Sequence, residues 1–207
     1  MRIAITKSVG GFFHEVLGEA VKTRQVEATD EAMSYLVALL TEFAHPGPVM
    51  GDAFDRPLAF LLDEAFRTTG AERFQKLRTL GDGVLYITGF FGDHIENRGV
   101  DMGYVTSVGA TAYRGAASML RRPATDAAEG TKRSDETDNV FGELSTKFDC
   151  FVDVLTAVAE TTLAQQARGE RGILKLYERW LRSGSTTLAR ELGARGIVPV
   201  RGTGGLH

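Results

Sequence analysis

The amino-acid sequence predicts an all-α fold: a single-domain helical bundle of about seven helices spanning residues 1–207. Apolar residues recur every three or four positions along most of the chain, which is the spacing of helices that bury one face. The alternating pattern of a strand is confined to residues 2–6. With 207 residues, of which 43% are hydrophobic, the chain is long enough to bury one sizeable core.

Three amphipathic segments are expected in the first third of the chain. They cover residues 12–21, 29–43 and 57–66. Thr29 precedes two acidic residues and is a favourable N-cap. Pro57 is favoured at a helix start, and Gly70 is placed where a C-cap is needed.

A glycine-rich antiparallel hairpin is expected at the centre of the fold, with helices over residues 77–97 and 101–120. Apolar residues follow helical spacing in both halves, and Gly99 and Asp101 mark the break. Glycines interrupt the two segments at positions that include Gly81, Gly83, Gly89, Gly92, Gly103 and Gly109. Each costs about 1 kcal/mol relative to alanine in a helix interior. We therefore expect them either to allow a close approach of two backbones or to hold a group against one of them.

The last third of the chain starts with a polar stretch. Residues 123–139 contain no large apolar side chain and are expected to form an exposed loop. Helices are then expected over residues 141–162, 173–181 and 185–193. Residues 198–207 are expected to form an extended tail.

Composition restricts the class of protein. A single cysteine, Cys150, excludes an internal disulfide and favours a cytoplasmic location. The longest charge-free apolar run near the centre, residues 83–92, is half of what spans a bilayer. The net charge is only −3, which makes nucleic acid an unlikely main partner.

Asp82 is the most informative ionisable residue because it interrupts an apolar helical stripe. A buried carboxylate needs a partner, and in the expected hairpin Asp82 lies opposite Ala116, within about one turn of Arg114. We expect an Asp82–Arg114 ion pair. The alternatives are an exposed Asp82 or a ligand pocket. The pocket candidates are Asp82, Tyr86, His94, Tyr104 and Arg114.

No metal site, cofactor or catalytic residue is predicted. A di-metal carboxylate bundle needs two Glu-x-x-His pairs, and the chain has one, Glu42–His45. His94 lies beside aromatic residues and could serve as an axial haem ligand, but a hydrogen-bonded structural histidine is the simpler interpretation. Gly81–Gly83 lacks the residues of a phosphate-binding loop.

A basic row is the clearest surface feature. From Arg168 onward the chain has eight Lys or Arg and three Asp or Glu, although the whole chain is acidic. Five of the cations recur every three or four residues, opposite an apolar stripe. They are Arg168, Arg171, Lys175, Arg179 and Arg182. The row is interpreted either as a solvated helix face partly paired with Glu170 and Glu178, or as a surface that binds an acidic protein, a phosphate-bearing surface or the chain's own acidic loop 123–139.

One segment resembles a group of uncharacterised bacterial all-helical proteins. The residues that carry the resemblance are Leu80-Gly81-Asp82, Leu85, Gly89-Phe90-Phe91, Tyr104, Gly109, Ala112-Tyr113, Trp180-Leu181, Gly184 and Gly196-Ile197-Val198-Pro199. It spans roughly residues 58–200 and implies no named activity and no site residue.

The sequence therefore favours a bacterial helical protein that acts by binding a protein partner, in a regulatory or interaction role, rather than by catalysis. The alternative is a ligand-binding protein or an enzyme with its pocket around Asp82. The partner and the oligomeric state are not predicted.

Overall fold

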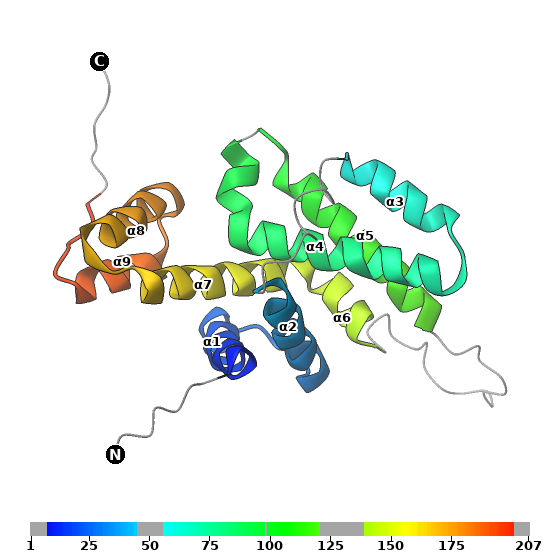
Figure 1. Cartoon of the computed structure of the whole chain (residues 1–207), viewed down its shortest axis with the longest axis horizontal. Coiled ribbons are helices and arrows are strands. Elements are labelled where there is room, and N and C mark those ends of the chain that lie inside the picture. Colours follow the sequence, from blue (N-terminus) through cyan, green and yellow to red (C-terminus); the bar gives the residue numbers. More distant parts are fainter. Residues whose placement is uncertain (1–7, 45–55, 98, 121–138, 201–207) are drawn as a thin grey trace. The chain divides into compact units, whose positions relative to one another are not determined.

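The computed structural model describes residues 8–44, 56–97, 99–120 and 139–200, which form nine α-helices and no β-strand (Figure 1). The helices are α1 (Val9–Arg24), α2 (Asp30–Phe43), α3 (Leu58–Arg67), α4 (Gly70–Asn97), α5 (Met102–Leu120), α6 (Val140–Thr146), α7 (Phe148–Gln166), α8 (Gly169–Ser183) and α9 (Thr186–Ala194). The predicted all-α class is confirmed. Within the described ranges, no helix has the length and apolar character needed to cross a bilayer.

The prediction of about seven helices is close, and the nine described helices exceed the eight expected segments by one division. The expected helix over residues 141–162 is divided into α6 and α7 at Lys147, whose backbone leaves the helical region (φ −105°, ψ 25°). A one-residue break leaves the spacing of Phe141, Leu144 and Phe148 at three and four residues. Hydrophobic periodicity therefore does not detect it.

Three segments discussed above lie wholly or mainly outside the described residues. These are residues 2–6, the loop 123–139 except for Asn139, and the tail beyond residue 200. Asn139 is the N-cap of α6, where its side chain accepts a hydrogen bond from the Gly142 amide. Residues 197–200, at the start of the expected tail, have no regular secondary structure.

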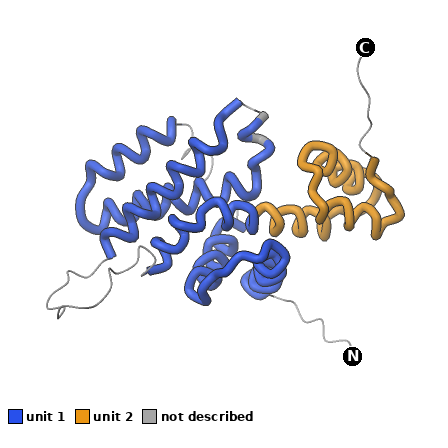
Figure 2. The backbone as a smooth tube through the Cα atoms, turned by 180° about the vertical axis from the view of Figure 1, so that it is seen from behind, with its two compact units in different colours: residues 1–155 blue, residues 156–207 orange. Residues whose placement is uncertain are grey.

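The chain divides into two compact units, residues 1–155 and residues 156–207 (Figure 2). The second unit has a core of its own, formed by Ala164, Leu176, Trp180, Leu188 and Leu192. The prediction of one domain over residues 1–207 stays a prediction.

In the first unit, α4 and α5 make the most extensive helix contact, and α3 packs against both (Figure 1). α1 packs on α2, while α6 contacts α5 and α2. The fully buried side chains include Leu36 of α2, Leu77 and Leu85 of α4, and Tyr113 of α5. This core brings α2, α4, α5 and α6 together.

The glycines of α4 and α5 make room for large side chains of neighbouring helices. Gly81 lies against the Tyr113 ring, and a Cβ added to Gly81 would be 2.6 Å from two carbons of that ring. A Cβ on Gly89 would collide with Leu155 of α7, and one on Gly109 with the Phe148 ring. At Gly81 and Gly109 the structure therefore agrees with the second expectation, a group held against the helix, whereas a close approach of the two hairpin backbones stays a prediction. At these positions the burial of bulky side chains offsets the low helix propensity of glycine.

Candidate functional site

Asp82 forms a polar centre that links three helices. Its side chain is 13% exposed. One carboxylate oxygen, Oδ1, accepts hydrogen bonds from the hydroxyls of Tyr35 of α2 (2.6 Å) and Tyr113 of α5 (2.7 Å). The other, Oδ2, is 3.4 Å from Nε of Arg78, one turn earlier on α4. These four residues are called the Asp82 centre below.

Aromatic rings enclose the Asp82 centre. The Phe141 ring of α6 meets the Tyr35 ring edge-on at 5.3 Å and the Tyr113 ring at 5.9 Å. The Arg78 guanidinium lies over the Tyr35 ring, 5.5 Å from its centroid, and its Nε also donates to the Tyr35 hydroxyl at 3.0 Å. The cation is therefore shared between a carboxylate and a phenol.

Burial controls the ionisation of the Asp82 centre. It raises the pKa of Asp82 above the usual value of 3.8, although the hydrogen bonds from Tyr35, Tyr113 and Arg78 oppose the shift. Burial, followed by the negative charge of Asp82, also raises the pKa of Tyr35 and of Tyr113. Both phenols therefore keep their protons at neutral pH and act as donors to the carboxylate.

The expected Asp82–Arg114 ion pair is wrong in its basic partner. Arg114 is exposed on α5, and the cation beside Asp82 is Arg78. The observed helix register, with Gly81 packed on Tyr113 and Gly115 on Leu77, differs from the expected one but still leaves Arg114 within about one turn of the level of Asp82. Arg114 is not the partner because it directly follows the buried Tyr113 and is therefore rotated by about 100° to the exposed side of α5. The spacing of four residues between Arg78 and Asp82 was the available sequence signal, whereas nothing local pointed to Tyr35.

The other pocket candidates have separate surroundings. Tyr86 stacks between Phe43 of α2 and Phe90, at ring distances of 4.5 and 4.7 Å. Burial raises the pKa of Tyr86. Tyr104 is 43% exposed on α5. His94 belongs to α4, but its side chain is outside the described part. No hydrogen bond in the described part joins Tyr86 or Tyr104 to Asp82, so a shared pocket stays a prediction.

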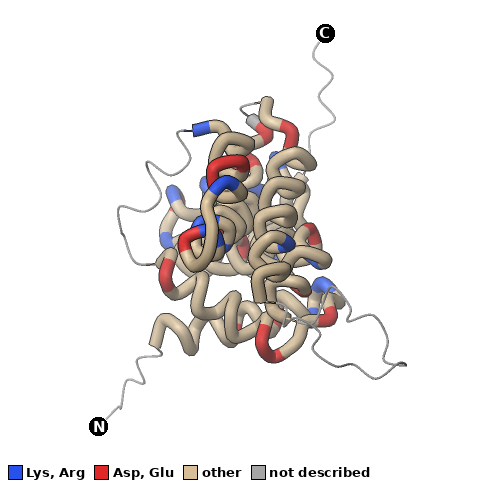
Figure 3. Tube along the Cα trace, turned by 90° about the vertical axis from the view of Figure 1, so that its right-hand side faces the viewer, with Lys and Arg blue, Asp and Glu red and all other residues tan. Residues whose placement is uncertain are grey.

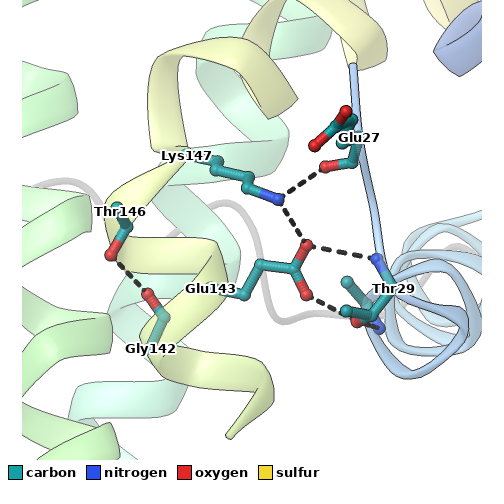
Figure 4. Close-up of polar contacts among 7 residues, drawn as sticks. Glu27, Thr29, Gly142, Glu143, Thr146 and Lys147 are labelled. Carbon is teal, nitrogen blue, oxygen red and sulfur yellow. Dashed lines mark hydrogen bonds and ion pairs between the residues drawn. The ribbon is translucent and has the colours of Figure 1, made fainter. Parts of the chain in front are cut away.

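A second buried carboxylate, Glu143 of α6, was not singled out from the sequence. Figure 4 shows its side chain reaching the start of α2. Oε1 accepts from the Thr29 amide (3.1 Å) and from Nζ of Lys147 (3.1 Å), while Oε2 accepts from the Thr29 hydroxyl (2.5 Å). Nζ of Lys147 also donates to the Glu27 carbonyl at 2.7 Å.

Glu143 supplements the N-cap of a helix from a distant element. Thr29 caps α2 by accepting from the Ala32 amide (3.2 Å), and Glu143 then adds negative charge at this positive helix end. Burial alone would raise the pKa of Glu143, but the hydrogen bonds from Thr29 and Lys147 hold it below its usual value. The spacing Glu143–Lys147 was visible in the sequence, but the contact over 114 residues was not.

Four of the five cations of the predicted basic row are exposed on or beside α8. Arg168 precedes the helix as its N-cap, and Arg171, Lys175 and Arg182 are exposed on it, whereas Arg179 is half-buried. These five residues are called the α8 basic face. Figure 3 marks basic and acidic positions along the trace and shows both interspersed on the side that it draws.

Neither carboxylate centre resembles a metal site. Within residues 8–44, 56–97, 99–120 and 139–200, no group of three or more His, Cys, Asp or Glu side chains is placed to hold a metal ion. His45, the histidine of the single Glu-x-x-His spacing, lies outside these ranges.

No family model, curated protein or solved structure matches the chain. The resemblance to a group of bacterial helical proteins therefore stays a prediction. Any functional interpretation of this chain has to be argued from its own side chains.

Proposed function

We propose that this chain is a cytoplasmic helical protein that acts by binding an acidic partner protein through the α8 basic face. The observation that carries the proposal is the exposure of Arg168, Arg171, Lys175 and Arg182 on or beside a helix that has only two acidic residues, Glu170 and Glu178. Among the described residues, none of these four cations forms a salt bridge. Their positive charge is therefore available to an external partner.

Several surface cations of the first unit are paired with carboxylates of the same unit. Lys22 pairs with Glu19 at 3.2 Å, and Arg67 pairs with Asp63 at 2.8 Å, in both cases within one helix turn. Lys76 contacts two carboxylates. Pairing of this kind is the usual arrangement of a solvated helix face. The four exposed α8 cations have no such pair, which among the described residues is also true of Arg24 and Arg114, so it is their clustering on one helix face that supports an external role.

Helix stability does not account for Arg171. It occupies the third position of α8, where a positive charge opposes the helix dipole and costs about 0.3–1 kcal/mol. Arg182, in the last turn, is favoured by the same dipole. A cation retained at an unfavourable position is consistent with selection for binding.

The alternative, a ligand-binding protein or an enzyme with a pocket around Asp82, has less support. The Asp82 carboxylate accepts its hydrogen bonds from the chain's own Tyr35 and Tyr113 and faces Arg78. A carboxylate satisfied in this way stabilises helix packing and is not free to contact a substrate.

The test is partner capture by the immobilised full chain from an extract of the native cell. The variant Arg171→Glu/Lys175→Glu/Arg182→Glu reverses three exposed cations of the α8 basic face. Its matched control, Arg24→Glu/Arg114→Glu/Arg190→Glu, reverses three exposed arginines of other helices. We expect the control to capture the same acidic proteins as the wild type and the α8 variant to lose them.

Salt provides an independent check. Raising the ionic strength from about 0.1 M to about 1 M shortens the screening length from about 10 Å to about 3 Å, so capture by the wild type should fall. Capture that is insensitive to salt, or equal for the α8 variant and the wild type, would contradict the proposal. Circular dichroism melting of both variants verifies that the fold is retained.

A further inference from the structure

The exposed side of α8 also carries two leucines. Leu174 is 57% exposed and Leu181 is 42% exposed. They are seven residues apart, or nearly two full turns, and therefore lie on the same side of the helix about 10 Å from each other. Large apolar side chains in this arrangement form a short row in contact with water.

The leucine row runs beside the α8 basic face. Successive residues of a helix are rotated by about 100°, which places Leu174 about 60° from Arg171 and Leu181 about 100° from Arg182. Leu176 and Trp180 lie on the opposite side and are buried in the core of the second unit. The outer surface of α8 thus presents an apolar row and a cationic row, and the exposed Glu178 lies between them, about 40° from Leu174 and about 40° from Arg182.

We infer that the partner docks on α8 as an amphipathic helix, with apolar side chains against Leu174 and Leu181 and a row of Asp or Glu against the α8 basic face. The inference rests on the proposed function and adds the form of the partner. An apolar ridge with a seven-residue repeat fits the groove of a second helix. Charges flanking such a seam set the partner's orientation and select its sign.

The width of the apolar surface favours a helical partner over a lipid surface. A helix that lies in a membrane interface inserts a broad apolar face. The broad apolar face of α8, with Ile173, Leu176 and Trp180, is directed into the core of the second unit. What remains outside is a row of two leucines, which matches one ridge of a helix.

The experiment measures binding of the full chain to labelled probes by fluorescence anisotropy. One peptide probe places leucines at i, i+3, i+4 and i+7 with glutamates along the flanks. A second peptide has the same composition in scrambled order, and vesicles containing phosphatidylserine form the third probe. The variant Leu174→Gln/Leu181→Gln removes the apolar row but preserves helix propensity. Leu120→Gln, at a 49% exposed leucine of α5, is its control.

We expect the wild type and Leu120→Gln to bind the amphipathic peptide more tightly than the scrambled one. The Leu174→Gln/Leu181→Gln variant should bind it about tenfold more weakly, at the level of the scrambled peptide. The reason is that the variant no longer buries two leucine side chains against the apolar side of the peptide. Charge reversal of the α8 basic face should weaken binding of both peptides.

Three results would overturn the inference. The first is equal binding of the amphipathic peptide by the leucine variant and the wild type; if charge reversal still abolishes partner capture, the proposed function survives it. The second is binding to vesicles that depends on the leucines, without preference between the peptides. The third is a lower melting temperature of the leucine variant, which would mean that Leu174 and Leu181 pack within the chain.

Discussion

Replacing Asp82 by alanine should lower the free energy of unfolding by about 3 kcal/mol, because it removes the acceptor shared by two tyrosines. Tyr113 is completely buried, so water cannot replace the lost hydrogen bond. Its stranded hydroxyl alone costs about 1–3 kcal/mol. Tyr35 is partly exposed and contributes less. The Arg78 side chain is 38% exposed, which reduces the contribution of its ion pair to below about 1 kcal/mol.

The assay is urea unfolding at neutral pH followed by circular dichroism. Arg114→Ala is the matched control, since Arg114 was the expected partner and is exposed on α5. It should change the free energy of unfolding by no more than about 0.5 kcal/mol. Tyr113→Phe removes one donor but leaves Asp82 with two partners and should cost about 1 kcal/mol. An Arg114→Ala effect as large as that of Asp82→Ala would refute the reasoning.

Two further predictions concern close packing and pH. Gly89→Ala should destabilise the fold by about 1–3 kcal/mol, because the added Cβ collides with Leu155. Gly18→Ala should instead stabilise the fold by up to about 1 kcal/mol, because a Cβ there meets no atom within 4 Å. Thermal melts of the two variants measure both effects. Glu143 has a lowered pKa, so the stability of the wild type relative to Glu143→Gln should fall as the pH drops below 4.5. Asp82 has a raised pKa, so the stability of the wild type relative to Asp82→Asn should instead rise as the pH is lowered toward 3.8. Urea titrations at several pH values measure the free energy of unfolding of each protein. If this free energy changes with pH in the same way for the wild type and for both variants, both pKa shifts are contradicted.

Local patterns in the sequence determined the all-α class and most of the helix boundaries. Thr29 caps α2 as predicted, and Ser185, the first residue of the expected segment 185–193, caps α9 by accepting from the Leu188 amide. The exposed row on α8 was equally readable, since residues three or four apart share a side of any helix. These features depend on neighbours within one or two turns, and such neighbours are fixed by the chain itself.

Tertiary structure alone decided the partners that the two carboxylates find on other helices. Asp82 meets Tyr35, which is 47 residues away, and Glu143 meets Thr29, which is 114 residues away. Helical periodicity gives the direction of a side chain around its own axis, but it does not give the register between two helices. That register follows from how bulky side chains fit into the spaces above the glycines, as Tyr113 does over Gly81. Packing of this kind couples residues far apart in the chain, so it emerges only when the whole core has assembled.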